Sequence, residues 1–89
     1  MTKEELFERL ASIEHERWAD WQRYVHSKCV KNNDGTLTIP KWAVEQWERQ
    51  INTPYSGLTE EEKDKDREQV MRYWHLIDKL LIISGLIKC

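Results

Sequence analysis

Four ionisable residues stand directly before two tryptophans in the stretch IEHERWADWQRY, residues 13–24. On a helical wheel that turns about 100° per residue, Glu14 and Arg17 fall inside an apolar arc, and His15 lies at its edge. A buried charge needs a partner or water, because desolvating an unpaired ion is costly. The pattern therefore predicts either a structural salt bridge or a wet binding site beside the indole rings.

A second group of charges that borders an apolar face lies in EEEKDKDR, residues 60–67. Aromatic rings stack on bases and attract cations, and arginine binds phosphates with two hydrogen bonds. One interpretation is therefore a site for an anionic, ring-bearing ligand. The other pairs Glu14 with Arg17, or Asp66 with a neighbour of Arg67, and treats the acidic run as a solvated helix face. The candidate ligand-binding residues are His15, Arg17, Trp18, Trp21, Tyr55, Lys63 and Arg67.

The usual signatures of catalysis and metal binding are not found in the sequence. HERWA is not a zinc motif, because Ala19 stands where HExxH needs its second histidine. His26 and Cys29 are spaced like half of a metal site, but no second pair completes it. No glycine-rich phosphate loop or nucleophile elbow occurs. We therefore expect no cofactor, no metal and no enzymatic activity, with histidine acid–base chemistry as the remaining alternative.

Composition limits the function further. Eighty-nine residues predict one domain, and 14 Lys and Arg against 16 Asp and Glu argue against a protein that coats nucleic-acid duplexes or membranes. The longest apolar run, residues 81–87, is too short to cross a bilayer, and the charged N-terminus is no secretory signal. Two cysteines form no disulfide framework, so we expect a cytoplasmic protein with reduced thiols.

The hydrophobic pattern predicts a small all-α domain in which two long helices pack together, joined by a short middle helix and irregular loops. Residues 3–28 read as one amphipathic helix, for which Thr2 and Glu5 could form a capping box. Its expected buried face consists of Leu6, Phe7, Leu10, Ala11, Ile13, Trp18, Trp21, Tyr24 and Val25.

Turn signals divide the rest of the chain. NNDG at residues 32–35 predicts a turn, and TLTI after it a short extended piece. Pro40 suits the first position of a helix that ends near Ile51, with an apolar stripe of Trp42 or Ala43, Val44, Trp47 and Ile51. A third helix opens at Thr59, with Glu62 as its box partner, and ends near Gly85. Its expected core face consists of Val70, Tyr73, Trp74, Ile77, Leu80 and Leu81.

The C-terminal segment LIISGLIKC leaves four apolar residues beyond that stripe. They are Ile82, Ile83, Leu86 and Ile87. They could cap the core or form a patch through which the chain forms a homo-oligomer.

Two blocks of the sequence resemble the RyR domain, the small repeat first described in ryanodine receptors and also found in bacterial and phage proteins. That family opens with Leu-Ala before His-x-x-Trp, here Leu10, Ala11, His15 and Trp18. Its later signature is a proline and an aromatic residue, a leucine, then an acidic run with Lys and Arg. PYSGLTEEEKDKDR, residues 54–67, is similar. The family's Gly-Trp-x-Tyr-Gly turn is replaced here by YVHSKC and the insert PKWAVEQWERQI.

The resemblance implies a stand-alone RyR-like module over residues 1–89, of the kind that recognises nucleotide-derived small molecules, including cyclic and ADP-ribose-type messengers of defence signalling. Such a copy has no effector domain to switch, so it would act by lowering the free ligand, as a phage-borne sequestering protein would. The alternative is a protein–protein interaction module or inhibitor that uses its aromatic surface and apolar C-terminus, because Trp, Tyr and Arg dominate interface hot spots.

Overall fold

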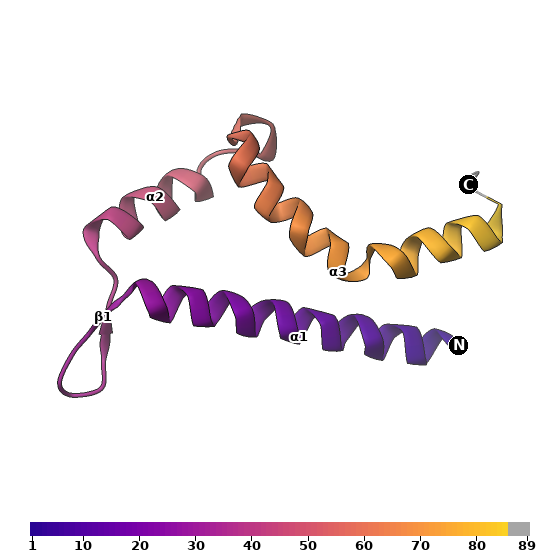
Figure 1. Cartoon of the computed structure of the whole chain (residues 1–89), viewed down its shortest axis with the longest axis horizontal. Helices are drawn as coiled ribbons and strands as arrows, with labels where there is room; N and C mark the ends of the chain where they lie inside the picture. Colours follow the sequence, from indigo (N-terminus) through magenta and orange to yellow (C-terminus); the bar gives the residue numbers. More distant parts are fainter. Residues whose placement is uncertain (86–89) are drawn as a thin grey trace. The chain divides into compact units, whose positions relative to one another are not determined.

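The computed structural model describes residues 1–85. Over this part the chain forms three α-helices: α1 (Lys3–Lys28), α2 (Lys41–Ile51) and α3 (Glu60–Ser84) (Figure 1). Between α1 and α2 lies an antiparallel hairpin of β1 (Val30–Lys31) and β2 (Leu37–Thr38), and a single 3-10 turn, Tyr55–Gly57, precedes α3. The long helices α1 and α3 contact each other and α2 is short, which confirms the predicted helical fold.

Contacts between Cα atoms divide the chain into two compact units. The first unit comprises Met1–His15 and Glu60–Cys89, and therefore the N-terminal half of α1 and all of α3. The second unit, Glu16–Thr59, comprises the C-terminal half of α1, the hairpin, α2 and the 3-10 turn.

Local hydrogen bonds explain where the helices begin and end. The Glu5 N–H donates to Thr2 Oγ1 at 3.0 Å, which is the forward half of the predicted capping box. Pro40 is the N-cap residue of α2, with φ −68°. It was predicted to be the first residue of the helix, so α2 begins one residue later than predicted. At the end of α3 the Gly85 N–H donates to the Ile82 carbonyl at 3.1 Å, and Gly85 has φ +76°. That left-handed conformation favours glycine, so the predicted helix stop is confirmed.

A network of polar side chains holds the hairpin together. The Asn32 side-chain amide donates to the hydroxyl oxygens of Thr36 and Thr38, each at 2.9 Å. The backbone N–H and the hydroxyl of Thr36 both donate to Asp34 Oδ1, at 3.0 and 2.7 Å. Gly35 supplies φ +88° at the tip. The predicted turn and extended piece are confirmed, but the partner strand β1 was not predicted, because two residues are too few to produce a periodic signal.

These hydrogen bonds make a prediction about the titration of Asp34. The pKa of the Asp34 carboxyl is lowered below its ordinary value of 3.8. The main cause is the hydrogen bond that the carboxylate accepts from the Thr36 hydroxyl, and the second is the one from the Thr36 N–H. The network therefore contributes its stability above that value and loses it as the pH falls through the lower, folded pKa. Thr36→Val should raise the pKa of Asp34 toward 3.8 in an NMR titration. Thr38→Val, which leaves both bonds to Asp34 intact, should not raise it; equal shifts in the two variants would contradict the assignment.

The predicted buried face of α1 is wrong for the single chain. No residue of α1 is buried. Half-buried side chains recur every three or four residues along the first half of α1, so that Leu6, Leu10 and Ile13 are partly covered whereas Phe7 and Trp18 are exposed. The arc was predicted from hydrophobicity alone, but each neighbouring helix covers only a narrow strip of a helix surface.

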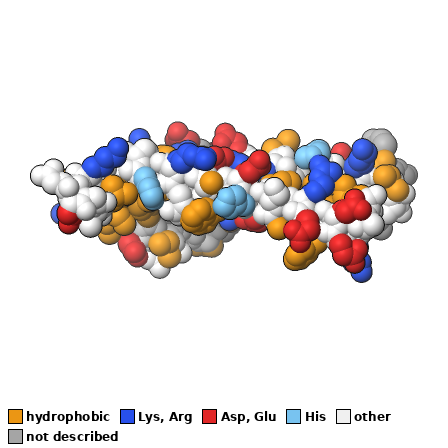
Figure 2. All heavy atoms as spheres, turned by 90° about the horizontal axis from the view of Figure 1, so that it is seen from below, with side chains coloured by type: hydrophobic (Ala, Val, Ile, Leu, Met, Phe, Trp, Pro, Cys, Tyr) orange, Lys and Arg blue, Asp and Glu red, His pale blue; other side chains and the backbone are white. Residues whose placement is uncertain are grey.

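The predicted core faces of α2 and α3 also need correction. Within residues 1–85 the only buried hydrophobic residues are Ala43, 0% exposed, and Leu76, 7% exposed. The prediction gave Trp42 or Ala43 as the first residue of the apolar stripe of α2, and Ala43 is the buried one. Leu76 was not in the predicted stripe of α3. The predicted core positions that are instead exposed are Trp42, Val44, Ile51, Val70, Trp74 and Leu80. Both helices carry more apolar residues than a single inward face can hold, so apolar side chains reach the surface between charged ones (Figure 2).

The same holds for the C-terminal segment as far as the structure describes it. Ile82 and Ile83 are exposed, so they do not cap the core. Leu86 and Ile87, the other two residues of that prediction, lie outside the described residues.

Candidate ligand-binding site

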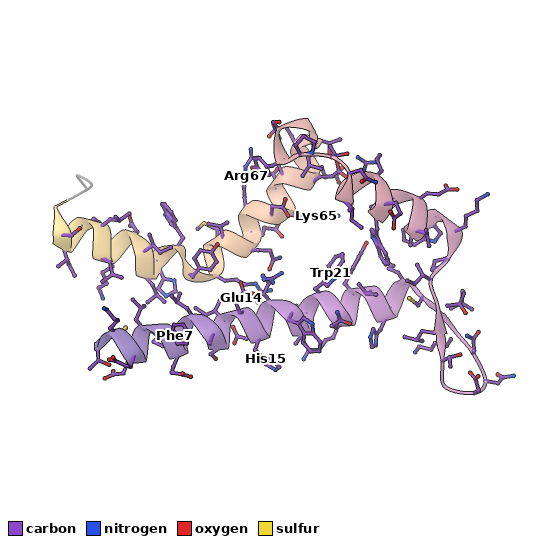
Figure 3. The ribbon with its side chains drawn as sticks, turned by 180° about the vertical axis from the view of Figure 1, so that it is seen from behind. Phe7, Glu14, His15, Trp21, Lys65 and Arg67 are labelled. Atoms are coloured by element: carbon purple, nitrogen blue, oxygen red, sulfur yellow. The ribbon has the colours of Figure 1, made fainter. Side chains whose placement is uncertain are left out.

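Three aromatic rings meet in the second unit and define what we call the aromatic cluster: Trp21 and Tyr24 of α1, and Trp47 of α2. The Trp21 and Tyr24 rings are stacked, with centroids 5.5 Å apart and planes 27° from parallel. The Trp21 and Trp47 centroids lie 6.0 Å apart with a tilt of 57°. In Figure 3 Trp21 lies on the side of α1 that faces α2. Separations of this size are typical of attractive aromatic pairs.

A lysine adds a positive charge to this cluster. Lys28 Nζ lies 5.6 Å from the centroid of the Tyr24 ring, within the range of a cation–π contact. The spacing on α1 explains the arrangement, because Trp21, Tyr24 and Lys28 follow one another at intervals of three and four residues and so share one helix face. Trp21 remains 45% exposed and Tyr24 and Trp47 are half-buried, so the cluster is open to water.

Three other candidate residues lie in the same unit. Arg17 and Trp18 precede the cluster on α1, where Arg17 is half-buried and Trp18 is exposed. Tyr55 begins the 3-10 turn and is exposed. The expectation that Arg17 is drawn inward is thus met in part.

The remaining candidates, His15, Lys63 and Arg67, belong to the first unit. Arg67 Nη1 donates to Asp64 Oδ1 at 2.7 Å and to Glu60 Oε2 at 3.0 Å, while Lys63 Nζ lies 3.4 Å from Glu60 Oε1. The hydrogen bond and charge of Arg67, and then Lys63, lower the pKa of the Glu60 carboxyl below 4.5. The structure therefore brings Lys63 and Arg67 together, but around a carboxylate of their own helix.

This arrangement agrees with the structural interpretation of the acidic run at the start of α3. The structural interpretation paired Asp66 with a neighbour of Arg67. The structure shows ion pairs of Arg67 itself, with Asp64 and Glu60, one and two turns earlier on the helix. They are largely exposed, and such pairs contribute little to stability. His15 and Glu14 are also exposed and leave α1 on opposite sides in Figure 3. Glu14 lies on the side of α1 toward α3 in Figure 3, as expected, but its side chain stays exposed and is not buried in a core.

Sequence reasoning did not identify Tyr24, Trp47 and Lys28 as site residues. Tyr24 and Trp47 were both assigned to core faces, and Lys28 to the end of a helix. The spacing of Trp21, Tyr24 and Lys28 could have indicated a shared face, since three- and four-residue intervals are visible in the sequence. The approach of Trp47 could not have been found in this way, because it depends on how α2 packs against α1.

The described part of the chain holds neither a candidate metal site nor a helix that could cross a membrane. No group of three or more His, Cys, Asp or Glu side chains is placed to hold a metal ion among residues 1–85. Within the same residues, no helix combines the length and the apolar character that crossing a membrane requires.

Comparison with known proteins adds no relative. No protein-family model matches the chain, and no curated protein or solved structure matches it significantly. The RyR resemblance stays a prediction from the two sequence blocks that carry it.

Proposed function

We propose that the chain is a non-enzymatic binding module that captures a nucleotide-derived small molecule, and that the aromatic cluster of the second unit receives its ring. The observation that carries this proposal is the half-open stack of Trp21 on Tyr24, with Trp47 beside it and Lys28 over the Tyr24 ring. Stacked rings offer a π-face to a base, and a lysine beside them favours a ligand that carries phosphate.

The cluster differs in one respect from the set of residues predicted from the sequence. Arg67 and Lys63 already bind carboxylates of α3, so an anion would have to displace those pairs to reach them. Lys28 has no such competitor in its contact with Tyr24, which is a neutral ring. The proposal therefore assigns the base to Trp21 and the anionic group to Lys28.

Calorimetry against cyclic dinucleotides and ADP-ribose derivatives tests this function. Trp21→Ala should weaken binding about 10- to 100-fold, because one base–aromatic stack is worth about 1–3 kcal/mol. Lys28→Ala should also weaken binding, and Lys28→Arg should restore most of it. The matched controls are Trp42→Ala and Lys41→Ala, which change exposed residues of α2 and should leave affinity unchanged while circular dichroism confirms helicity. Failure of every ligand in the panel to bind would refute the proposal.

A second function is favoured by a different observation. Four of the five tryptophans, Trp18, Trp21, Trp42 and Trp74, are between 42% and 55% exposed. Half-exposed tryptophans are typical anchors of protein interfaces, which supports a protein–protein interaction module or inhibitor. The test is to purify a partner, identified by mass spectrometry after affinity capture, and to measure its binding with and without Trp42→Ala. Unchanged affinity in a reconstituted complex would argue against this use of the exposed indoles.

A further inference from the structure

The tip of the hairpin contains Asp34–Gly35, a peptide bond of the kind that rearranges without an enzyme. No other aspartate of the sequence is followed by glycine. Glycine favours the rearrangement because it has no side chain to shield its backbone nitrogen. In this hairpin Gly35 has φ +88°, and a side-chain carbon placed on it would have no atom within 4 Å. The nitrogen of Gly35 is therefore not shielded by neighbouring atoms.

The rearrangement is a condensation followed by a hydrolysis. The Gly35 nitrogen attacks Cγ of the protonated Asp34 carboxyl, a C–N bond forms, and the carboxyl hydroxyl leaves as water with the proton of the nitrogen. Water then adds to the resulting succinimide ring. Addition at Cγ restores aspartate, whereas addition at the α-carbonyl carbon leaves the chain running through Cβ and Cγ, which is isoaspartate. Residues 32–38 are all exposed, so the water that the second step needs is present.

In the folded hairpin both reacting groups are held by other partners. Asp34 Oδ1 accepts hydrogen bonds from the Thr36 N–H at 3.0 Å and from the Thr36 hydroxyl at 2.7 Å, which direct the carboxylate past Gly35. The Gly35 N–H donates to the Asn32 carbonyl at 3.1 Å, so the proton that must leave is engaged. The bonds from Thr36 also lower the pKa of Asp34 and keep it ionised, a form from which water cannot leave. These bonds must break before the ring can close.

The strands of the hairpin hold these bonds in place, but only over a short length. β1 and β2 pair Val30 with Thr38 and Lys31 with Leu37, and no residue of either strand is buried. Elements with little buried surface open locally at a low free-energy cost, without unfolding of the rest of the molecule. The tip therefore alternates between a closed form that holds the reacting groups apart and an open form that releases them.

We propose that Asp34–Gly35 is a modification site at which aspartate isomerises to isoaspartate when the hairpin opens, and that the Thr36 and Asn32 hydrogen bonds prevent the reaction while it is closed. Isoaspartate inserts one extra carbon into the backbone before Gly35. The Gly35 N–H then no longer lies opposite the Asn32 carbonyl, so the modified hairpin does not rebuild the same bonds. The modification is thus a lasting record of opening, and it does not depend on the proposed ligand.

Incubation of the full chain at neutral pH, in buffer and in concentrated urea, tests the proposal. Peptide mapping with electron-transfer fragmentation measures isoaspartate, because it distinguishes isomers of equal mass. Asp34 should isomerise at least about 10-fold more slowly in buffer than in urea, because only the open fraction reacts. Gly35→Ala should slow the reaction in urea, which assigns it to this bond, and Asp64, which precedes a lysine, is the internal reference. Equal rates in buffer and in urea would overturn the proposal.

Variants of Thr36 test which bonds protect the site. The rate of each variant in buffer is divided by its own rate in urea, which removes any change in intrinsic reactivity. Thr36→Val should raise this ratio about 2- to 10-fold, the equivalent of one hydrogen bond, whereas Thr36→Ser keeps the hydroxyl and should not raise it. Thr38→Val is the matched control: each valine variant removes one bond of the Asn32 amide, but only Thr36→Val removes a bond to Asp34. An unchanged ratio in Thr36→Val, or an equal rise in Thr38→Val, would overturn the role of Thr36.

Discussion

Ala43→Asp is expected to unfold the second unit. Ala43 is completely buried on the inner side of α2, so an aspartate at this position loses its hydration and also needs room that is not there. An unpaired buried charge costs several kcal/mol, which is comparable with the whole stability of about 5 kcal/mol expected for a small domain. Urea titration followed by tryptophan fluorescence measures the change, since Trp47 lies one turn along the same helix.

The control for this prediction is the neighbouring residue. Val44→Asp introduces the same charge into the same turn of α2, but Val44 is 42% exposed and its side chain already reaches water. Most surface substitutions change the free energy of unfolding by no more than about 0.5 kcal/mol, and we expect a loss near that value. If the two variants lost equal stability, α2 would not be packed through Ala43, and the core of the second unit would have to lie elsewhere.

Leu76→Ala is expected to destabilise the first unit by about 2–3 kcal/mol. Leucine-to-alanine changes in protein cores cost about 2–5 kcal/mol, and the value is lower where the surroundings can collapse into the space. Leu76 keeps 7% of its surface exposed, so we expect the lower part of that range. Thermal and urea unfolding monitored by circular dichroism at 222 nm would measure the loss.

Ile83→Ala serves as the comparison for Leu76→Ala. It removes an aliphatic side chain of equal size from the same helix at a position that is 75% exposed. Its cost should stay below about 1 kcal/mol, because little apolar surface returns to water. A loss as large as that of Leu76→Ala would mean that Ile83 is covered in solution, and the assignment of Leu76 as the core residue of α3 would fail.

The ends of the helices could be predicted because they depend on neighbouring residues. Thr2 caps α1 through a hydrogen bond three residues along the chain, Gly85 stops α3 through its own backbone conformation, and the Asn32–Gly35 turn closes on itself. Interactions between residues a few positions apart can be predicted from the residue types at those positions. The three helices therefore lie within one or two residues of where they were expected.

The core could not be predicted in the same way. Hydrophobicity marks every side of α3 that can be buried, and it does not say which side meets a neighbour within the same chain. Leu76 was missed for this reason, and Trp74 was assigned to the core although it is exposed. The candidate site was predictable to the same extent. The ion pair of Arg67 with Asp64 lies within one helix and follows from their spacing in the sequence. The contact of Trp21 with Trp47 joins two helices, so the sequence pattern could not predict it.

The small number of buried residues has a consequence for the thermodynamics of the single chain. The heat-capacity change of unfolding follows the apolar area that unfolding newly exposes to water. Much of the apolar area of this chain already faces water when the chain is folded, with only Ala43 and Leu76 buried among the hydrophobic residues described. The heat-capacity change on unfolding is therefore expected to be small for a chain of this length, and the curve of its stability against temperature to be correspondingly flat.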